Sequence, residues 1–120
     1  MGKELAKPEK SPFASADMLK ITVVGRKTGK SITVPVQFVH EKDKILLLPF
    51  MGKNTNWYSN LAKNPRITIT INKAKLQGNA KLSTDQATLR NVVGKFVDKY
   101  GRTNIATYYP KKEAFVEVTI

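Results

Sequence analysis

The side chains best suited to chemistry in this 120-residue chain are cations that gather in one short segment. Arg26, Lys27 and Lys30 lie close together in a stretch whose glycines are typical of a turn between two strands. The backbone N–H groups of such a turn, with three cations beside them, can bind a phosphate or a carboxylate group. A solvated hairpin tip would have the same composition, so the spacing alone leaves both interpretations open.

A further cation, Lys53, stands shortly before a predicted helix. Trp57, Tyr58 and Leu61 have the spacing of a short helix, and Pro65 ends it because proline disfavours helical backbone in the residue before it. The unpaired N–H groups at a helix N-terminus attract anions. Lys53 is therefore a second position at which an anionic group could be bound.

The rest of the sequence excludes most kinds of nucleophilic and metal chemistry. The chain has no cysteine, and its single histidine, His40, lies at the end of a predicted strand with no Gly-x-Ser-x-Gly motif to serve. One histidine and scattered carboxylates do not make a metal site, and no acidic pair has a spacing that suggests glycoside hydrolysis. If the protein is an enzyme, a bound cofactor carries the reaction while the chain supplies shape and charge.

The overall charge points to an anionic partner. The chain carries 21 Lys and Arg against 9 Asp and Glu, a net charge of +12, which suits nucleic acid, a membrane surface or a phosphorylated small molecule. No apolar run reaches the roughly 18 residues that a membrane helix needs. The first residues form no apolar signal segment, so we expect a cytoplasmic protein.

Apolar residues at every second position predict five or six strands. Residues 45–48 differ in being a short continuous apolar run, typical of a strand buried on both faces. Pro35 falls within the second strand and must lie at a sheet edge or at a bulge, because proline cannot donate to the ladder. The predicted strands cover residues 19–24, 32–38, 45–48, 67–71, 74–82 and 116–120.

The most regular helical pattern lies in the second half of the chain. Residues 83–86 have the sequence of a capping box, with Ser83 at the N-cap and Gln86 at the third helical position. Apolar residues then recur at helical spacing over residues 89–100, and Gly101 follows them, as glycine does at many helix C-termini.

Together these elements predict an α+β fold, a small antiparallel β-barrel with one amphipathic helix and one short helix. The chain has no internal repeat and no linker. We therefore expect one domain over residues 18–120, preceded by a polar, flexible N-terminal arm over residues 1–17.

Three segments of the chain resemble a known family. They are residues 21–29, Ile-Thr-Val-Val-Gly-Arg-Lys-Thr-Gly; residues 34–38, Val-Pro-Val-Gln-Phe; and residues 57–65, in which Trp-x-x-Asn-Leu-x-x-Asn-Pro is the pattern. In this order and at these intervals they resemble the deazaflavin-dependent nitroreductase family. The resemblance implies a split β-barrel of the flavin-reductase and pyridoxamine-phosphate-oxidase type, a homodimer, and the deazaflavin coenzyme F-420, whose phosphate and oligoglutamate tail are anionic.

The resemblance also implies which residues bind the cofactor. The basic turn near the tail and phosphate would use Arg26, Lys27 and Thr28. The strand whose backbone approaches the ring system corresponds to Pro35, Val36 and Gln37. The loop that covers phosphate and ring corresponds to Phe50, Met51, Gly52 and Lys53, and the helix beneath the site contributes Trp57 and Asn60. No metal is implied, and FMN is the alternative cofactor, because Phe50 and Met51 stand where the family more often has a Ser-Lys type pair.

The activity implied by the resemblance is that of an oxidoreductase. A hydride would pass between C5 of the deazaflavin and a small acceptor such as a quinone, an enone or a nitro compound. A proton would come from solvent or from a nearby phenol, for which Tyr100, Tyr108 and Tyr109 are the candidates.

Two other functions remain open at this point. A split barrel could bind FMN or a deazaflavin without turnover, using the same residues. A basic barrel could also bind nucleic acid, but the predicted strands lack the exposed aromatic residues, interleaved with cations, on which single-strand binders stack bases.

Overall fold

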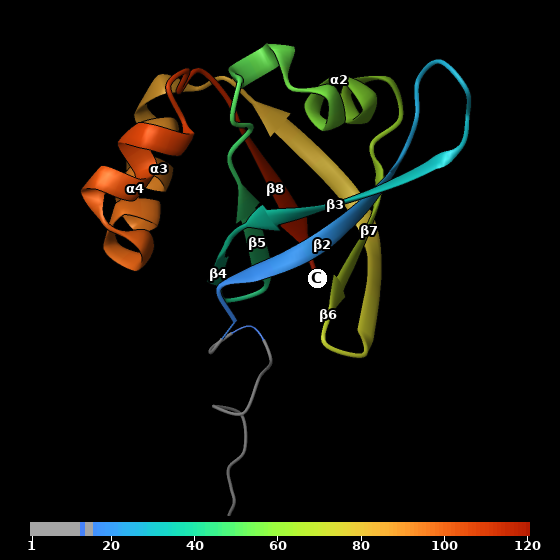
Figure 1. Ribbon diagram of the computed structural model, residues 1–120, viewed down its shortest axis with the longest axis horizontal. Helices are drawn as coiled ribbons and strands as arrows, with labels where there is room; N and C mark the ends of the chain where they lie inside the picture. The colour runs from blue at the N-terminus through green and yellow to red at the C-terminus, as the bar shows by residue number, and fades with distance from the viewer. Residues whose placement is uncertain (1–12, 14–15) are drawn as a thin grey trace, which may run out of the picture.

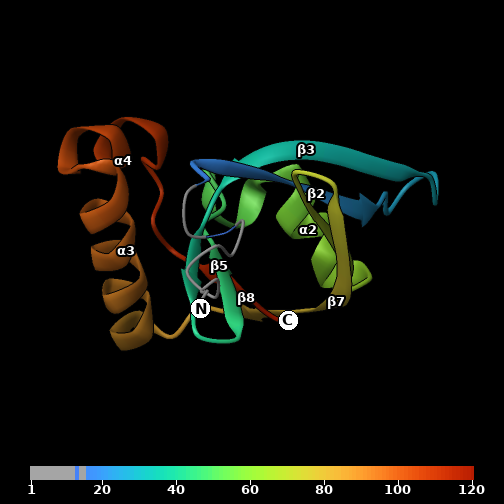
Figure 2. The same cartoon turned by 90° about the horizontal axis from the view of Figure 1, so that it is seen from below.

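The computed structural model describes residue 13 and residues 16–120 of the chain. Its centre is one antiparallel sheet of seven strands in the order β3-β2-β6-β7-β8-β5-β4, curled into a barrel (Figures 1 and 2). Most of the predicted N-terminal arm lies outside the described residues. The strands are β2 (Met18–Val24), β3 (Ser31–Gln37), β4 (Val39–Glu41), β5 (Lys44–Leu47), β6 (Arg66–Ile71), β7 (Ala74–Ser83) and β8 (Phe115–Thr119).

The sheet has one more strand than the highest number expected from the sequence, because the chain forms a further short strand, β4, directly after Phe38, where the second predicted strand ends. The side chain of Phe38 is buried, its N–H donates to the Tyr100 hydroxyl over 3.0 Å, and its carbonyl accepts from Lys99 Nζ over 2.9 Å. The chain thus leaves β3 at one edge of the sheet and enters β4 at the other. Phe38 joins the two edges and closes the barrel.

Pro35 lies on the edge strand β3, opposite Lys20 of β2. The β2–β3 register runs without interruption from Met18–Gln37 to Val24–Ser31, so the proline occupies an edge and not a bulge. The edge alternative of the prediction is confirmed. The free side of β3 consequently faces no other strand and is available to the site described below.

Three α-helices occur in the described part of the chain, α2 (Asn56–Lys63), α3 (Gln86–Tyr100) and α4 (Arg102–Tyr108), with a short 3₁₀ helix, η2 (Gly52–Asn54). The sequence predicted α2 and α3 but not α4. Gly101, with a φ of 95°, turns the chain between α3 and α4 (Figure 1). Of the seven residues of α4, only Ile105 is buried, so this helix lacks the apolar stripe that identifies a helix in a sequence.

The predicted capping box of α3 is wrong by two residues. Asp85 is the N-cap, and its carboxylate accepts from the backbone N–H of Thr88 over 2.9 Å. Ser83 instead ends β7, and its hydroxyl accepts from the N–H of Asp85. Gln86 donates to the carbonyl of Thr84 and does not reach back to the cap. The aspartate takes the cap because β7 continues through Ser83 to pair with β8.

Two apolar clusters lie on opposite faces of β5. Ile45 and Leu47 point into the barrel interior, whereas Leu46 and Leu48 pack against α3 through residues such as Phe96. The prediction of a strand buried on both faces is confirmed. Figure 2 shows α3 and α4 packed on one side of the barrel, at the opposite side from the turn of the β2–β3 hairpin. No helix among the described residues is long and apolar enough to cross a membrane.

Candidate active site

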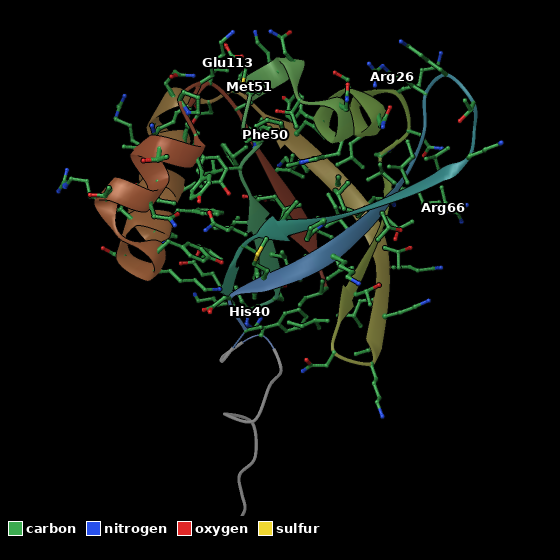
Figure 3. The ribbon with its side chains drawn as sticks, in the orientation of Figure 1. Arg26, His40, Phe50, Met51, Arg66 and Glu113 are labelled. Atoms are coloured by element: carbon green, nitrogen blue, oxygen red, sulfur yellow. The ribbon has the colours of Figure 1, made fainter. Side chains whose placement is uncertain are left out.

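Two cavities follow the edge strand β3 and meet at Phe50. The first, of about 500 Å³, lies between the basic turn and the start of α2. The second, of about 430 Å³, lies between β3 and α4. Phe50 lines both and is 52% exposed, and Figure 3 shows it under η2, between α2 and the paired helices α3 and α4.

The basic turn is held to α2 by one buried side chain. Asn60 is 3% exposed, and its Oδ1 accepts from Arg26 twice, from the backbone N–H over 3.1 Å and from Nη1 over 2.7 Å. Arg26 Nη1 also lies 3.4 Å from the carbonyl oxygen of Asn56. The guanidinium is therefore fixed at the wall of the first cavity. Asn60 therefore positions Arg26, and it also lines the first cavity.

Fewer groups of the basic turn are free to bind an anion than the sequence suggested. The N–H groups of Gly25, Arg26, Gly29 and Lys30 are already bonded within the protein. Those of Lys27 and Thr28 have no partner among the described residues, and both residues line the first cavity. Lys30 lines neither cavity. Any anion bound here would therefore meet Arg26, Lys27 and Thr28 without Lys30.

The apolar part of the first cavity comes from β3 and α2. Ile32 and Val34 of β3 and the mostly buried Trp57 of α2 line it. No aspartate or glutamate lines this cavity. A lining that contains both cations and apolar side chains suits a ligand that combines an anionic group with a flat apolar body.

The predicted covering loop divides into two parts. Phe50 reaches the cavities, whereas Met51, Gly52 and Lys53 line neither of them. The N–H of Lys53 donates to Glu113 over 2.8 Å, and a side-chain carbon at Gly52 would collide with the same carboxylate. Figure 3 shows Met51 and Glu113 together at this end of the barrel.

The loop also presents residues to the first cavity that the sequence did not single out, Asn54, Thr55 and Asn56. Thr55 is buried, and its Oγ1 accepts from the N–H of Met51 over 2.8 Å. The signal that could have found them is their place directly before Trp57, where a helix N-terminus was expected.

The second cavity is uncharged. Pro35, Val36 and Gln37 of β3 form one wall, and Tyr108, Tyr109 and Asn104 of the α4 region form the other. Tyr109 donates to Gln37 Oε1 over 2.9 Å, and Gln37 Nε2 donates to Asn104 Oδ1 over 3.1 Å. Asn104 was not predicted, because nothing in the sequence indicated α4.

The three candidate phenols have different surroundings. Burial, and to a lesser extent the neighbouring Tyr100, raise the pKa of Tyr109 far above its ordinary value, so this phenol is a weaker proton donor than an ordinary tyrosine. Tyr108 is 59% exposed at the rim of the second cavity. Burial also raises the pKa of Tyr100, whose hydroxyl lies at the β3–β4 junction, bonded to Phe38 and to the carbonyl of Asp17. Tyr100 lines neither cavity.

His40 lies away from both cavities, at the opposite end of the barrel from Met51 and Glu113 (Figure 3). Its ring packs on Phe13, with 4.8 Å between the ring centroids. The described residues contain no group of three or more side chains that could hold a metal ion.

The sequence of the chain matches a known enzyme family. A family model for the F-420H(2)-dependent quinone reductases matches residues 3–109. The chain belongs to this family. It is therefore a deazaflavin-dependent oxidoreductase, and its cofactor is coenzyme F-420, as the resemblance in the sequence implied.

Solved structures of similar proteins share the fold. An F-420-H2 dependent reductase, FDR-A, gives a TM-score of 0.67 at 21% identity, with 85% of this chain and 93% of that chain covered. A structure described as a domain-swapped dimer gives 0.68 at 21% identity, covering 85% and 79%. A Listeria innocua protein assigned as a pyridoxamine 5′-phosphate oxidase gives 0.69 at 11% identity, covering 92% and 88%. The predicted α+β split β-barrel is confirmed.

Proposed function

We propose that the first cavity binds the phosphate-bearing part of F-420, that the deazaflavin ring lies along β3 beside Phe50, and that the second cavity binds a quinone. The observation that carries this proposal is the difference in charge between two cavities that meet at Phe50. The first has cations and no acidic residue in its wall, which suits the anionic tail of F-420. The second has no charged residue, which suits a neutral acceptor.

The residues present fit the cofactor by their donor chemistry. Arg26 is held in place by Asn60, and the neighbouring Lys27 and Thr28 offer an ammonium, a hydroxyl and two unpaired backbone N–H groups. Ile32 and Trp57 supply apolar walls for a ring system. When bound, reduced F-420 supplies a hydride, and the quinone takes up one further proton to become the hydroquinone.

The chain's own contribution to the reaction is to bind and orient. Since Tyr109 holds its proton in a hydrogen bond to Gln37, the exposed Tyr108 or solvent is better placed to supply the proton that the product needs. Phe50 covers the point where donor and acceptor would meet. Holding two reactants in contact in this way is itself a large part of catalysis in hydride transfer.

A binding experiment separates the candidate functions. The purified protein is titrated with oxidised and reduced F-420, with FMN and with a DNA oligomer, and hydride transfer to menadione is then followed. We expect tight F-420 binding with turnover. Binding without turnover on any quinone or nitro acceptor would indicate a carrier protein, and preferential FMN binding would reassign the cofactor. Steeply salt-dependent DNA binding without flavin binding would indicate a nucleic-acid protein.

Lys27→Ala tests the place of the anionic tail. We expect this substitution to weaken F-420 binding by about tenfold, because it removes a cation from the wall of the first cavity. Lys30→Ala is the matched control, since it removes the same charge from the same turn but outside both cavities, and it should change the Kd by less than about twofold. Equal effects of the two variants would show that only overall charge matters.

We also propose that the protein forms a homodimer. The support is the solved neighbour described as a domain-swapped dimer, which shares this fold. Light scattering on the eluting size-exclusion peak would measure the mass directly, and a mass of about 13.4 kDa, that of a single chain, would contradict the proposal.

A further inference from the structure

A directional row of hydrogen bonds runs along the wall of the second cavity. The Tyr109 hydroxyl donates to Gln37 Oε1, and Gln37 Nε2 donates to Asn104 Oδ1. Tyr109 is only 6% exposed, so its hydroxyl proton needs an acceptor within the protein, and Gln37 Oε1 is that acceptor. This fixes the orientation of the Gln37 amide and, through it, that of the Asn104 amide.

The row ends in an unused donor. Because Asn104 accepts through Oδ1, its Nδ2 group points the other way along the row, and Nδ2 has no hydrogen-bond partner among the residues that the structure describes. Asn104 is half-buried on α4 and lines the second cavity. A half-buried amide with two unpaired N–H bonds is suited to bind a ligand oxygen.

Apart from the exposed hydroxyl of Tyr108 at the rim, the other lining groups compete little with this amide for a ligand oxygen. Leu48, Val36 and Phe50 are apolar, and the hydroxyl of Tyr109 is already used. A flat, neutral acceptor lying on these apolar side chains would have its polar atoms within reach of the α4 wall. The cavity therefore combines apolar side chains with a donor whose orientation is fixed by its neighbours, Asn104 Nδ2, a common arrangement for orienting a small ligand.

We propose that Asn104 is a specificity-determining residue, which donates an N–H bond to the oxygen of a neutral acceptor of the quinone or nitro class. Gln37 and Tyr109 are positioning residues that hold its amide in the donating orientation. The inference rests on the function proposed above. Negative charge develops on the acceptor oxygen as it receives the hydride, so the bond strengthens in the transition state and acts on kcat/KM.

Asn104→Asp removes the donor and adds a negative charge to the uncharged cavity, and both changes oppose binding of the developing oxyanion. The carboxylate keeps an oxygen that can accept from Gln37 Nε2 but has no N–H to offer, so the contact to β3 survives while the donor is lost. We expect kcat/KM for menadione to fall by about tenfold or more, with the Kd for F-420 and the Tm close to those of the unmodified protein. Asn91→Asp is the matched control, because Asn91 lies on α3 outside both cavities, and it should stay within about twofold.

Nuclear magnetic resonance gives a readout that does not depend on turnover. The side-chain NH₂ signals of Asn104 are identified by their loss in Asn104→Asp, and menadione is then titrated into the unmodified protein without cofactor. We expect these signals to shift with menadione concentration. Menadione binding that leaves them unmoved would overturn the inference, as would no menadione binding at all.

The two proposals fail differently. If the unmodified protein binds F-420 and reduces menadione, but Asn104→Asp keeps its kcat/KM within twofold, the inference is wrong and the proposed function stands. If the unmodified protein neither binds F-420 nor transfers a hydride, the proposed function is wrong and this inference with it.

Discussion

At the scale of single residues, the molecule places one aromatic ring where two cavities meet. Phe50 is half-exposed, lines both cavities and is carried by a loop whose other residues are fixed elsewhere. The backbone N–H of Met51 donates to Thr55 and that of Lys53 donates to Glu113, so the loop's backbone is restrained at two points directly after Phe50. Phe50 is therefore expected to contact both reactants.

Phe50→Ala should weaken F-420 and menadione binding together, each by about three- to tenfold, because an aromatic contact contributes about 0.5–1.5 kcal/mol beyond its area. The Tm should change little, since the side chain is exposed. Met51→Ala is the control, as Met51 is an exposed neighbour outside both cavities. The idea fails if titration calorimetry finds only one of the two ligands affected, or if Met51→Ala has the same effect.

The residues that could be predicted are those whose chemistry follows from a local pattern, such as Lys27 in its turn and Trp57 in its helix. The contacts that give the site its shape could not, because they join residues far apart in the chain. Asn60 fixes Arg26 across 34 positions, and Tyr109 meets Gln37 across 72. No spacing rule links such pairs, and only the folded barrel brings them together.

At the scale of elements, segments with a clear apolar pattern were predictable, including the short strand β5, whereas β4 and α4 were not. Every second residue of β6 is buried, and α3 buries Leu89, Val92 and Phe96 at helical spacing. In contrast, β4 has three residues and α4 has seven, too few to show a period. Because α4 forms one wall of the second cavity and was not predicted, Asn104 was not predicted as a site residue either.

The N-cap of α3 gives a pH prediction at this scale. Hydrogen bonds from Thr88 hold the pKa of Asp85 below its ordinary value, so the ionised cap stabilises the folded state above the unfolded pKa of about 3.9. That stabilisation is lost as the pH falls through the lower, folded-state pKa. Asp85→Asn keeps a capping oxygen but does not titrate.

Calorimetry between pH 7 and about pH 2.5 measures this effect. The unmodified protein should have a higher Tm than Asp85→Asn. This difference should be largest above about pH 4.5 and should shrink on acidification. Asp85→Ala should lower the Tm by a few degrees at pH 7, because no side chain then caps the helix. A Tm difference between the unmodified protein and Asp85→Asn that is independent of pH would refute the role of the ionised cap.

At the scale of the whole molecule, the barrel is closed at one residue. Phe38 joins the two edge strands of the sheet. Two side chains of α3 bond to the Phe38 backbone: the Tyr100 hydroxyl accepts from its N–H, and the Lys99 ammonium donates to its carbonyl. The ammonium also lies 3.6 Å from the centroid of the Phe38 ring, and burial lowers the pKa of Lys99. This junction ties the helical side of the molecule to the strand that lines both cavities.

Tyr100→Phe distinguishes this structural role from the proton-donor role that the sequence suggested. Removing the hydroxyl leaves the N–H of Phe38 without its partner, so the free energy of unfolding in urea should fall by about 1–3 kcal/mol. Because Tyr100 lines neither cavity, kcat for menadione should stay within about twofold at a temperature where the variant is folded. Tyr108→Phe, which alters an exposed phenol at the cavity rim, should leave the unfolding free energy unchanged. A large loss of kcat in Tyr100→Phe with unaltered stability would instead make this phenol the proton donor.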